Sequence, residues 1–165
     1  MNADKILLGK RLLIVDDERD IHETLTDLLQ LCKIDSASSF EEAKKFLEHY
    51  DYDLVVLDIM GVKGFDLLEI ANNRNIPALM LTAHSLNVES LTKSMRQGAA
   101  YFVPKEKIAE IATYVADVLE AKERNKNPWK RWFDRLTGYF DTTFTGPNWR
   151  EQEKELLEKL RKAPQ

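Results

Sequence analysis

Four apolar runs of the sequence each end on side chains that could do chemistry. These side chains are a pair of carboxylates, a third carboxylate, a hydroxyl and an ammonium: Asp16 and Asp17, Asp58, Thr82 and Lys105. Crowded carboxylates repel one another, and each takes up a proton more readily unless a cation joins them. The set therefore favours a site that binds a divalent metal ion.

Magnesium suits this set of side chains. Mg2+ takes about six oxygen ligands and often combines one or two carboxylates with waters and phosphate oxygens. A carboxylate can attack phosphorus to form an acyl phosphate, so Asp58 is the candidate nucleophile. The metal ion and Lys105 would neutralise charge on the transferred group, and the Thr82 hydroxyl would donate a hydrogen bond to one of its oxygens.

The elements that must position these groups are predicted strands. Residues 54–58 form an apolar run that ends on Asp58, which is typical of a strand buried on both faces of a parallel sheet. Further runs occupy residues 11–15, 34–37, 77–82 and 101–105. In open α/β sheets, ligands bind beyond the carboxyl ends of the strands, so the reactive side chains should share one edge.

Helical patterns separate these strands. Apolar residues recur at three- and four-residue spacing after each strand, and the last such segment runs from Ile108 to Leu119. Ser39 and Glu42 have the spacing of a capping box at the start of one helix. Strand and helix thus alternate five times within residues 1–124. This alternation predicts an α/β fold, a doubly wound five-stranded parallel sheet covered on both faces.

The pattern resembles the receiver domain of two-component response regulators, over residues 1–124. The resemblance rests on residues in the expected order and strand context: Asp16 and Asp17, Asp58, Thr82 and Ala83, Phe102 and Lys105. It implies a flavodoxin-like fold and a signalling phosphoacceptor rather than a turnover enzyme. Asp58 would accept a phosphoryl group from a histidine kinase or phosphotransfer protein. The implied Mg2+ ligands are Asp16, Asp17, Asp58 and the backbone carbonyl of Met60.

The resemblance also implies roles for neighbouring residues. Ala83 would leave room for the phosphoryl group, and Phe102 would rotate inward when Thr82 moves. Met60 and His84 occupy positions that tune hydrolysis of the aspartyl phosphate in this family. Residues 59–64 depart from the family pattern, because this loop is two residues shorter than usual and lacks the customary proline.

Two alternative functions remain open at this point. The shortened loop favours an interaction module that acts independently of phosphorylation. A magnesium-dependent phosphohydrolase with an aspartyl nucleophile is the other alternative, but enzymes that resemble haloacid dehalogenases carry a second aspartate where this chain has Met60. Taken singly, Asp16, Asp17 and Thr82 are ordinary helix caps, and Lys105 is an ordinary surface charge. The functional interpretation depends on their meeting at one edge.

Residues 125–165 are predicted to form a separate helical extension. Pro128 suits the first turn of a helix, and large apolar side chains then form one stripe: Trp129, Trp132, Phe133, Leu136 and Phe140. Charged residues are expected opposite the stripe: Lys130, Arg131, Asp134 and Arg135. Residues 142–147 are predicted as a linker, and Asn148 with Glu151 could cap a final helix.

The apolar stripe must be covered by something. Packing against the preceding domain or a second copy of the chain is the leading explanation, which makes a homodimer one candidate assembly. An unknown downstream protein is the next candidate, and a membrane surface is an alternative because cations flank the tryptophans. Neither direct nucleic-acid binding nor a DNA-binding output unit is expected from a tail of this composition.

Composition is consistent with a cytoplasmic protein. The 165 residues carry a net charge of −4 and one cysteine, Cys32, so no intrachain disulfide can form. The first residues lack the apolar core of a signal peptide, and no apolar run approaches the length of a membrane-spanning helix. The acidic balance argues against a field that attracts nucleic acid over the whole surface.

Overall fold

A computed structural model of the chain describes residues 2–83 and 88–143. Its five strands form one parallel sheet in the order β2-β1-β3-β4-β5. The strands are β1 Arg11–Val15, β2 Lys33–Ala37, β3 Leu54–Asp58, β4 Ala78–Thr82 and β5 Tyr101–Pro104. The predicted fold class, a flavodoxin-like doubly wound sheet, is confirmed, because this strand order reverses direction at the β1 and β3 pair.

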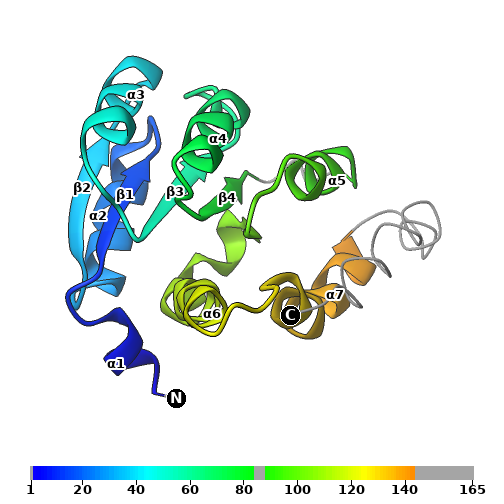
Figure 1. Ribbon diagram of the computed structural model, residues 1–165. Helices are drawn as coiled ribbons and strands as arrows, with labels where there is room; N and C mark the ends of the chain where they lie inside the picture. Colours follow the sequence, from blue (N-terminus) through cyan, green and yellow to red (C-terminus); the bar gives the residue numbers. More distant parts are fainter. Residues whose placement is uncertain (1, 84–87, 144–165) are drawn as a thin grey trace.

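Helices cover both faces of the sheet. They are α1 Ala3–Leu7, α2 Arg19–Leu28, α3 Phe40–His49, α4 Gly64–Asn73, α5 Val88–Arg96, α6 Ile111–Glu123 and α7 Trp129–Thr143, with a short 3-10 helix, η1, at Lys105–Glu110. Figure 1 shows α3, α4 and α5 on one face, and α2 and α6 on the other with α1 beside α6. Strands β3 and β4 lie between them and are buried along their full length.

The register brings the strand ends that carry the predicted site residues to one edge. Asp58 of β3 pairs with Leu81 of β4, and Thr82 pairs with Pro104 of β5. On the other side of β3, Leu57 pairs with Val15 of β1. The residues that follow β1, β3, β4 and β5 therefore meet at the carboxyl edge of the sheet, as the apolar runs predicted.

One helix was missed and two local predictions needed correction. Helix α1 was not predicted, because five residues with two buried side chains carry little periodic signal. The fifth strand ends at Pro104, so Lys105 opens η1 and is not a strand residue. The last helix of the alternation begins at Ile111, not Ile108, since η1 occupies the preceding residues.

The capping box also differs in detail. The Ser39 side chain accepts a hydrogen bond from Glu42 N, as the spacing predicts. Glu42 Oε1 accepts from Ser38 N and not from the cap residue itself. The carboxylate thus satisfies a backbone donor one residue earlier, while the start of α3 is still fixed.

Helix α7 packs beside β5, the edge strand of the sheet (Figure 1). Trp129 Nε1 donates a hydrogen bond to the Ala99 carbonyl and Trp132 Nε1 to the Phe102 carbonyl, each at 2.8 Å. Trp129, Trp132, Leu136 and Phe140 are buried in the same core as the sheet, and Phe133 is partly buried. Packing against the preceding domain is therefore confirmed as the cover of this stripe, and the four buried side chains are not presented to a lipid surface.

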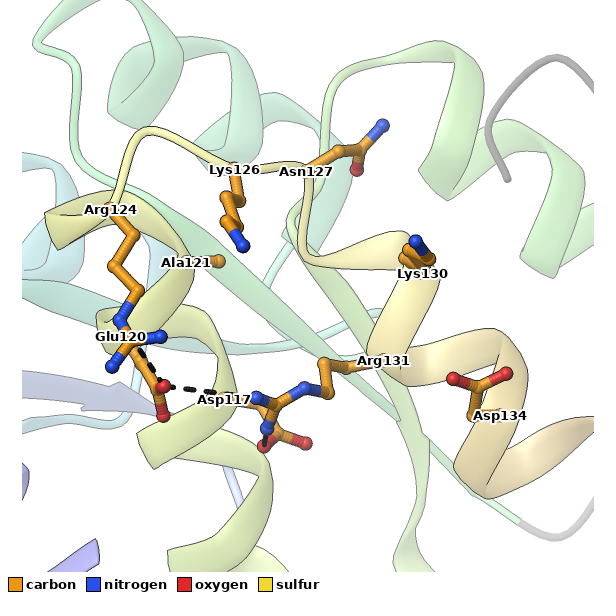
Figure 2. A pocket seen from close by; sticks show the side chains of 9 residues that line it. All are labelled: Asp117, Glu120, Ala121, Arg124, Lys126, Asn127, Lys130, Arg131 and Asp134. Atoms are coloured by element: carbon orange, nitrogen blue, oxygen red, sulfur yellow. Dashed lines mark hydrogen bonds and ion pairs between the residues drawn. The ribbon is translucent and has the colours of Figure 1, made fainter. Parts of the chain in front are cut away.

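The charged residues of α7 are exposed while the stripe is buried, as predicted. Two of them also make contacts that were not predicted: Arg131 and Arg135 reach α6, where they pair with the buried carboxylate of Asp117. Figure 2 shows the pocket between α6 and α7, where Arg131 and Arg124 also approach Glu120, at 3.7 and 3.5 Å. The two acids of α6 in this pocket are thus paired with arginines, and Lys126, Lys130 and Asp134 also line the pocket.

Two further findings concern the tail. Helix α7 continues to Thr143, so the first residues of the predicted linker are helical. The predicted cap at Asn148 and the final helix lie outside the described residues. Within the described ranges, no helix is both long and apolar enough to cross a membrane.

Candidate functional site

The ends of β1, β3 and β5 meet around one ammonium group. Lys105 Nζ lies 3.0 Å from Asp16 Oδ2, 3.4 Å from Asp58 Oδ1 and 3.3 Å from Glu18 Oε1. Asp16 and Asp58 are buried, with 0% and 4% of their surface exposed. The structure therefore brings together three groups that lie far apart in the sequence, and it surrounds one cation with several carboxylates.

Burial and the neighbouring carboxylates change the proton affinity of Asp58. Burial, followed by the charge of Asp16, raises the pKa of Asp58 to about 6, although Lys105 acts in the opposite direction. Burial lowers the pKa of Lys105, but its contact with Asp16 and the charge of Asp58 outweigh that effect, so the pKa is raised. Lys105 therefore remains charged at neutral pH and does not balance its acidic neighbours alone.

A hard divalent cation fits this group of residues. Carboxylate oxygens of Asp16, Asp17 and Glu18 lie within 4.8 Å of one another. Among the described residues, no donor makes a hydrogen bond to the buried Asp16 Oδ2, which has only the ion pair with Lys105. An oxygen of this kind is a ready cation ligand, and oxygen ligands are those that Mg2+ prefers.

The short loop after β3 lies tightly against these acids. Gly61 has φ +75°, and a Cβ atom there would stand 2.6 Å from Asp17 Oδ2. A Cβ atom at Gly64 would stand 2.2 Å from the Asp58 carbonyl oxygen. At Gly64 the nearest atoms are backbone, so only glycine fits, whereas at Gly61 a side chain would strain the backbone and push the Asp17 carboxylate aside. The shortened loop thus approaches the acidic cluster by backbone alone.

Met60 lies at the outer side of this loop. Its side chain is 72% exposed, so the thioether does not enter the cluster. Its carbonyl oxygen accepts a hydrogen bond from Val62 N at 2.7 Å. A carbonyl oxygen has a second lone pair, which remains able to bind a cation.

The remaining predicted site residues have no described contact with Lys105. Thr82 is buried at the end of β4, and Ala83 follows it and is exposed. His84 lies outside the described residues. Phe102 is fully buried, and its ring packs on Phe140 of α7 with centroids 5.7 Å apart. Phe102 is therefore associated with α7 and not with the acidic cluster.

Two residues near the cluster were not predicted as site residues. Glu18 contacts Lys105, and its position directly after the acidic pair was the available signal. His22 Nε2 lies 2.5 Å from the Asp16 carbonyl oxygen, while its buried Nδ1 has no hydrogen-bond partner among the described residues. A histidine six residues after Asp16 reaches that carbonyl because α2 turns back over the strand end, and this contact cannot be seen in a residue pattern.

The sequence of this chain is similar to known proteins of one family. The model of the response regulator receiver domain matches residues 12–116. The two-component response regulator ARR18 of Arabidopsis thaliana is 35% identical over 109 residues, which are 62% of this chain and 17% of that protein. The response regulator protein FleR of Pseudomonas aeruginosa is 33% identical over 107 residues, 59% of this chain and 22% of FleR. The chain thus spans less than a quarter of the length of these relatives.

Solved structures agree with this result. A CheY-like response regulator receiver domain protein from Methanospirillum hungatei aligns with a TM-score of 0.65 and 23% identity, over 71% of this chain and 98% of that one. At that identity the likeness supports the fold alone. NtrX from Brucella abortus aligns with a TM-score of 0.63 and 28% identity, over 72% of this chain and 28% of NtrX. Because the family model covers more than half of the 165 residues, the chain belongs to the response regulator receiver domain family.

Proposed function

We propose that Asp58 accepts a phosphoryl group from a histidine kinase or phosphotransfer protein, in a reaction that depends on Mg2+. Receiver domains of this family are phosphoacceptors for histidine kinases, which is the starting point of the proposal. One observation carries it to these residues: Lys105 Nζ contacts both Asp58 and Asp16 at the carboxyl edge of the sheet. A cation beside a buried carboxylate is the arrangement that phosphoryl transfer needs.

Each group has a defined part in this reaction. Asp58 supplies the attacking oxygen, which must be ionised, and its raised pKa makes that ionisation sensitive to a nearby cation. Asp16 and Asp17, with the Met60 carbonyl, would hold Mg2+, which when bound supplies positive charge for the carboxylates and the incoming oxygens. Lys105 stabilises the negative charge of the transferred group, and the Thr82 hydroxyl can donate to one of its oxygens.

We propose that the output of the described residues passes through protein contact and not through DNA. Helix α7 is packed on β5 and α6, and Arg131 and Arg135 are engaged with the Asp117 carboxylate. Cations held by a protein carboxylate are not presented to nucleic-acid phosphates. The partner would be a downstream protein or a second copy of the chain, and light scattering with and without a phosphoryl mimic distinguishes the two.

Intact mass after incubation with Mg2+ and acetyl phosphate tests the proposal. We expect one acid-labile phosphoryl adduct in the wild type and none in Asp58→Asn. Asp66→Asn changes an exposed carboxylate at the start of α4 and should retain the adduct. Absence of an adduct in the wild type, or its persistence in Asp58→Asn, would contradict the assignment and favour a phosphorylation-independent module. Steady release of phosphate from a phosphate ester would favour the phosphohydrolase alternative.

A further inference from the structure

Helix α7 contacts the chain just before Lys105. The Phe140 ring packs on the Phe102 ring with centroids 5.7 Å apart, and Trp132 Nε1 donates to the Phe102 carbonyl at 2.8 Å. Trp132 and Phe140 stack on each other with centroids 5.4 Å apart, and both are fully buried. The strand that leads to Lys105 is therefore held by two large rings of α7.

The same helix contacts the chain just after Lys105. The Tyr139 hydroxyl donates a hydrogen bond to Glu106 Oε2 at 2.7 Å. Lys107 Nζ lies 5.2 Å from the centroid of the Tyr139 ring, within the range of a cation–π contact. The two residues that follow Lys105 in η1 are thus held by one side chain of α7.

Helix α7 is itself fixed to the rest of the domain. Arg135 Nε lies 2.6 Å from Asp117 Oδ2, and Arg131 NH1 lies 3.1 Å from Asp117 Oδ1. The Tyr101 hydroxyl of β5 donates to the same Asp117 carboxylate at 2.9 Å. A helix anchored at its middle to α6 and β5 can act as a rigid support for η1.

We propose that Tyr139 is a positioning residue for Lys105, and that docked α7 raises the affinity of the acidic site for a phosphoryl group. The inference rests on the proposed function of Asp58. A lysine side chain has a long flexible stem, and ordering its ammonium costs conformational entropy. Fixing the backbone on both sides of Lys105 meets part of that cost before the anion arrives, which is how preorganisation increases affinity.

Binding of two ligands, Mg2+ and a phosphoryl mimic, distinguishes a positioning effect on Lys105 from a general effect on the stability of the site. Mg2+ is attracted by the carboxylates of Asp16 and Asp58 and repelled by the ammonium of Lys105. A phosphoryl mimic is attracted by that same ammonium. Loosening Lys105 therefore weakens binding of the anion, while binding of Mg2+ alone stays unchanged or becomes tighter. Damage to the fold of the site would instead weaken both.

Calorimetric titration of the full chain tests this. Tyr139→Ala removes both contacts to η1, and we expect beryllofluoride affinity at saturating Mg2+ to fall about tenfold, in the usual range for coupled sites. The Kd for Mg2+ alone should stay the same or decrease. Tyr139→Phe keeps the ring over Lys107 and loses the hydrogen bond to Glu106, so a smaller fall of about threefold is expected.

Arg131→Gln is the matched control. It removes one exposed partner of Asp117, while Arg135 and the Trp132 hydrogen bond keep α7 docked, and no described contact of Arg131 reaches residues 102–107. Both affinities should therefore stay within about twofold. Unchanged beryllofluoride binding in Tyr139→Ala, or parallel weakening of both ligands, would overturn the positioning role. If the wild type itself failed to bind beryllofluoride, the proposed function of Asp58 would fall instead.

Thermodynamic reciprocity supplies a second measurement. If docked α7 tightens anion binding, bound anion must tighten α7 docking by the same factor. Hydrogen exchange of amides in residues 129–143 should therefore slow in the presence of Mg2+ and beryllofluoride, and this slowing should be lost in Tyr139→Ala. Equal exchange with and without the mimic in a wild type that binds it would also overturn the inference.

Discussion

Two clusters of buried charge in this molecule are built on opposite principles. At the carboxyl edge of the sheet, one ammonium group pairs with several carboxylates, since Lys105 contacts Asp16, Asp58 and Glu18. Between α6 and α7, two guanidinium groups and a tyrosine hydroxyl all donate hydrogen bonds to one carboxylate, that of Asp117. The first cluster is short of positive charge and the second is not.

If the proposed function is correct, this difference separates a reactive site from a structural clamp. A buried carboxylate with enough donors is stable as it stands, and Asp117 accepts hydrogen bonds at 2.6 to 3.2 Å from three side chains. A buried carboxylate without them keeps its proton longer, as the pKa of about 6 at Asp58 indicates. Unbalanced charge costs stability, and a perturbed group of this kind is a candidate for a functional site, as the proposed phosphoacceptor role requires.

The largest expected effect is on the clamp. Asp117→Ala leaves the buried Tyr101 hydroxyl without its acceptor and separates Arg131 and Arg135 from their counter-ion. Because both arginine side chains are about half exposed and can turn to water, we expect a loss at the low end for a broken buried pair, about 3 kcal/mol in the free energy of unfolding. Urea unfolding measures it. Asp134→Ala, an exposed acid on α7, should change it by less than about 0.5 kcal/mol.

Removal of a negative charge from the acidic site should instead increase the free energy of unfolding. The pKa of Asp58 is raised in the folded state from 3.8 to about 6, so between those values the folded state holds a proton that the unfolded chain has released. Stability is therefore lost as pH rises through this window. Asp58→Asn does not titrate, and it should be more stable than the wild type by about 2 kcal/mol at pH 7.5 without divalent ions.

The difference in stability between the wild type and Asp58→Asn should disappear at acid pH. Below about pH 3, Asp58 is protonated in both states and the two proteins should unfold at the same urea concentration, apart from local differences between the two side chains. A less stable Asp58→Asn at pH 7.5 would mean that Lys105 compensates the carboxylate fully. The contrast between the two clusters would then be wrong.

The sequence predicts the acidic site better than the clamp for a physical reason. Asp16 and Asp58 follow apolar runs directly, and parallel strands place their carboxyl ends at one edge whatever the side chains do. Asp117 lies among apolar residues of α6, and its partners lie on β5 and α7. Arg131 and Arg135 are four residues apart on α7, a spacing equally typical of a solvent face, so the pattern did not indicate a buried acceptor.

Other features depend on close packing, which periodicity does not encode. The hydrogen bonds from Trp129 and Trp132 to backbone carbonyls require the placement of α7 against β5, although the apolar stripe did predict that this helix must be covered. The contact of Gly61 with Asp17 requires the path of the shortened loop. The sequence showed that the loop was short, but not that it would lie against an acid.

Addition of Mg2+ should stabilise the protein through the acidic site and not through the clamp around Asp117. A ligand present at ten times its Kd stabilises the folded state by about 1.4 kcal/mol. We expect this shift in the wild type at pH 7.5 and in a clamp variant such as Arg131→Gln, but not in Asp16→Asn. The shift should shrink at pH 5.5, because protons compete with the metal ion for Asp58, whose pKa is about 6. A shift that did not depend on Asp16 would place the metal ion elsewhere.

The smallest expected effect concerns the loop that touches the acidic cluster. Gly61→Ala should cost about 1 kcal/mol of stability, because alanine is strained at φ +75°. It should also weaken Mg2+ binding about fivefold, since the new methyl group would stand 2.6 Å from Asp17 Oδ2 and must displace that carboxylate. Thermal unfolding and calorimetric titration with Mg2+ measure the two effects separately.

Gly9→Ala separates strain from contact. Gly9 has the same φ of +75°, but a Cβ atom there would meet nothing within 4 Å. Both variants should therefore lose similar stability, and only Gly61→Ala should lose affinity for Mg2+. Equal Mg2+ affinities in the two would mean that Asp17 moves aside without consequence, and the acidic cluster would then need only Asp16 and Asp58 to attract its cation. Weaker binding in Gly61→Ala alone would mean that the cluster depends on backbone fit as well as on charge, whereas the described contacts of the clamp around Asp117 are all made by side chains.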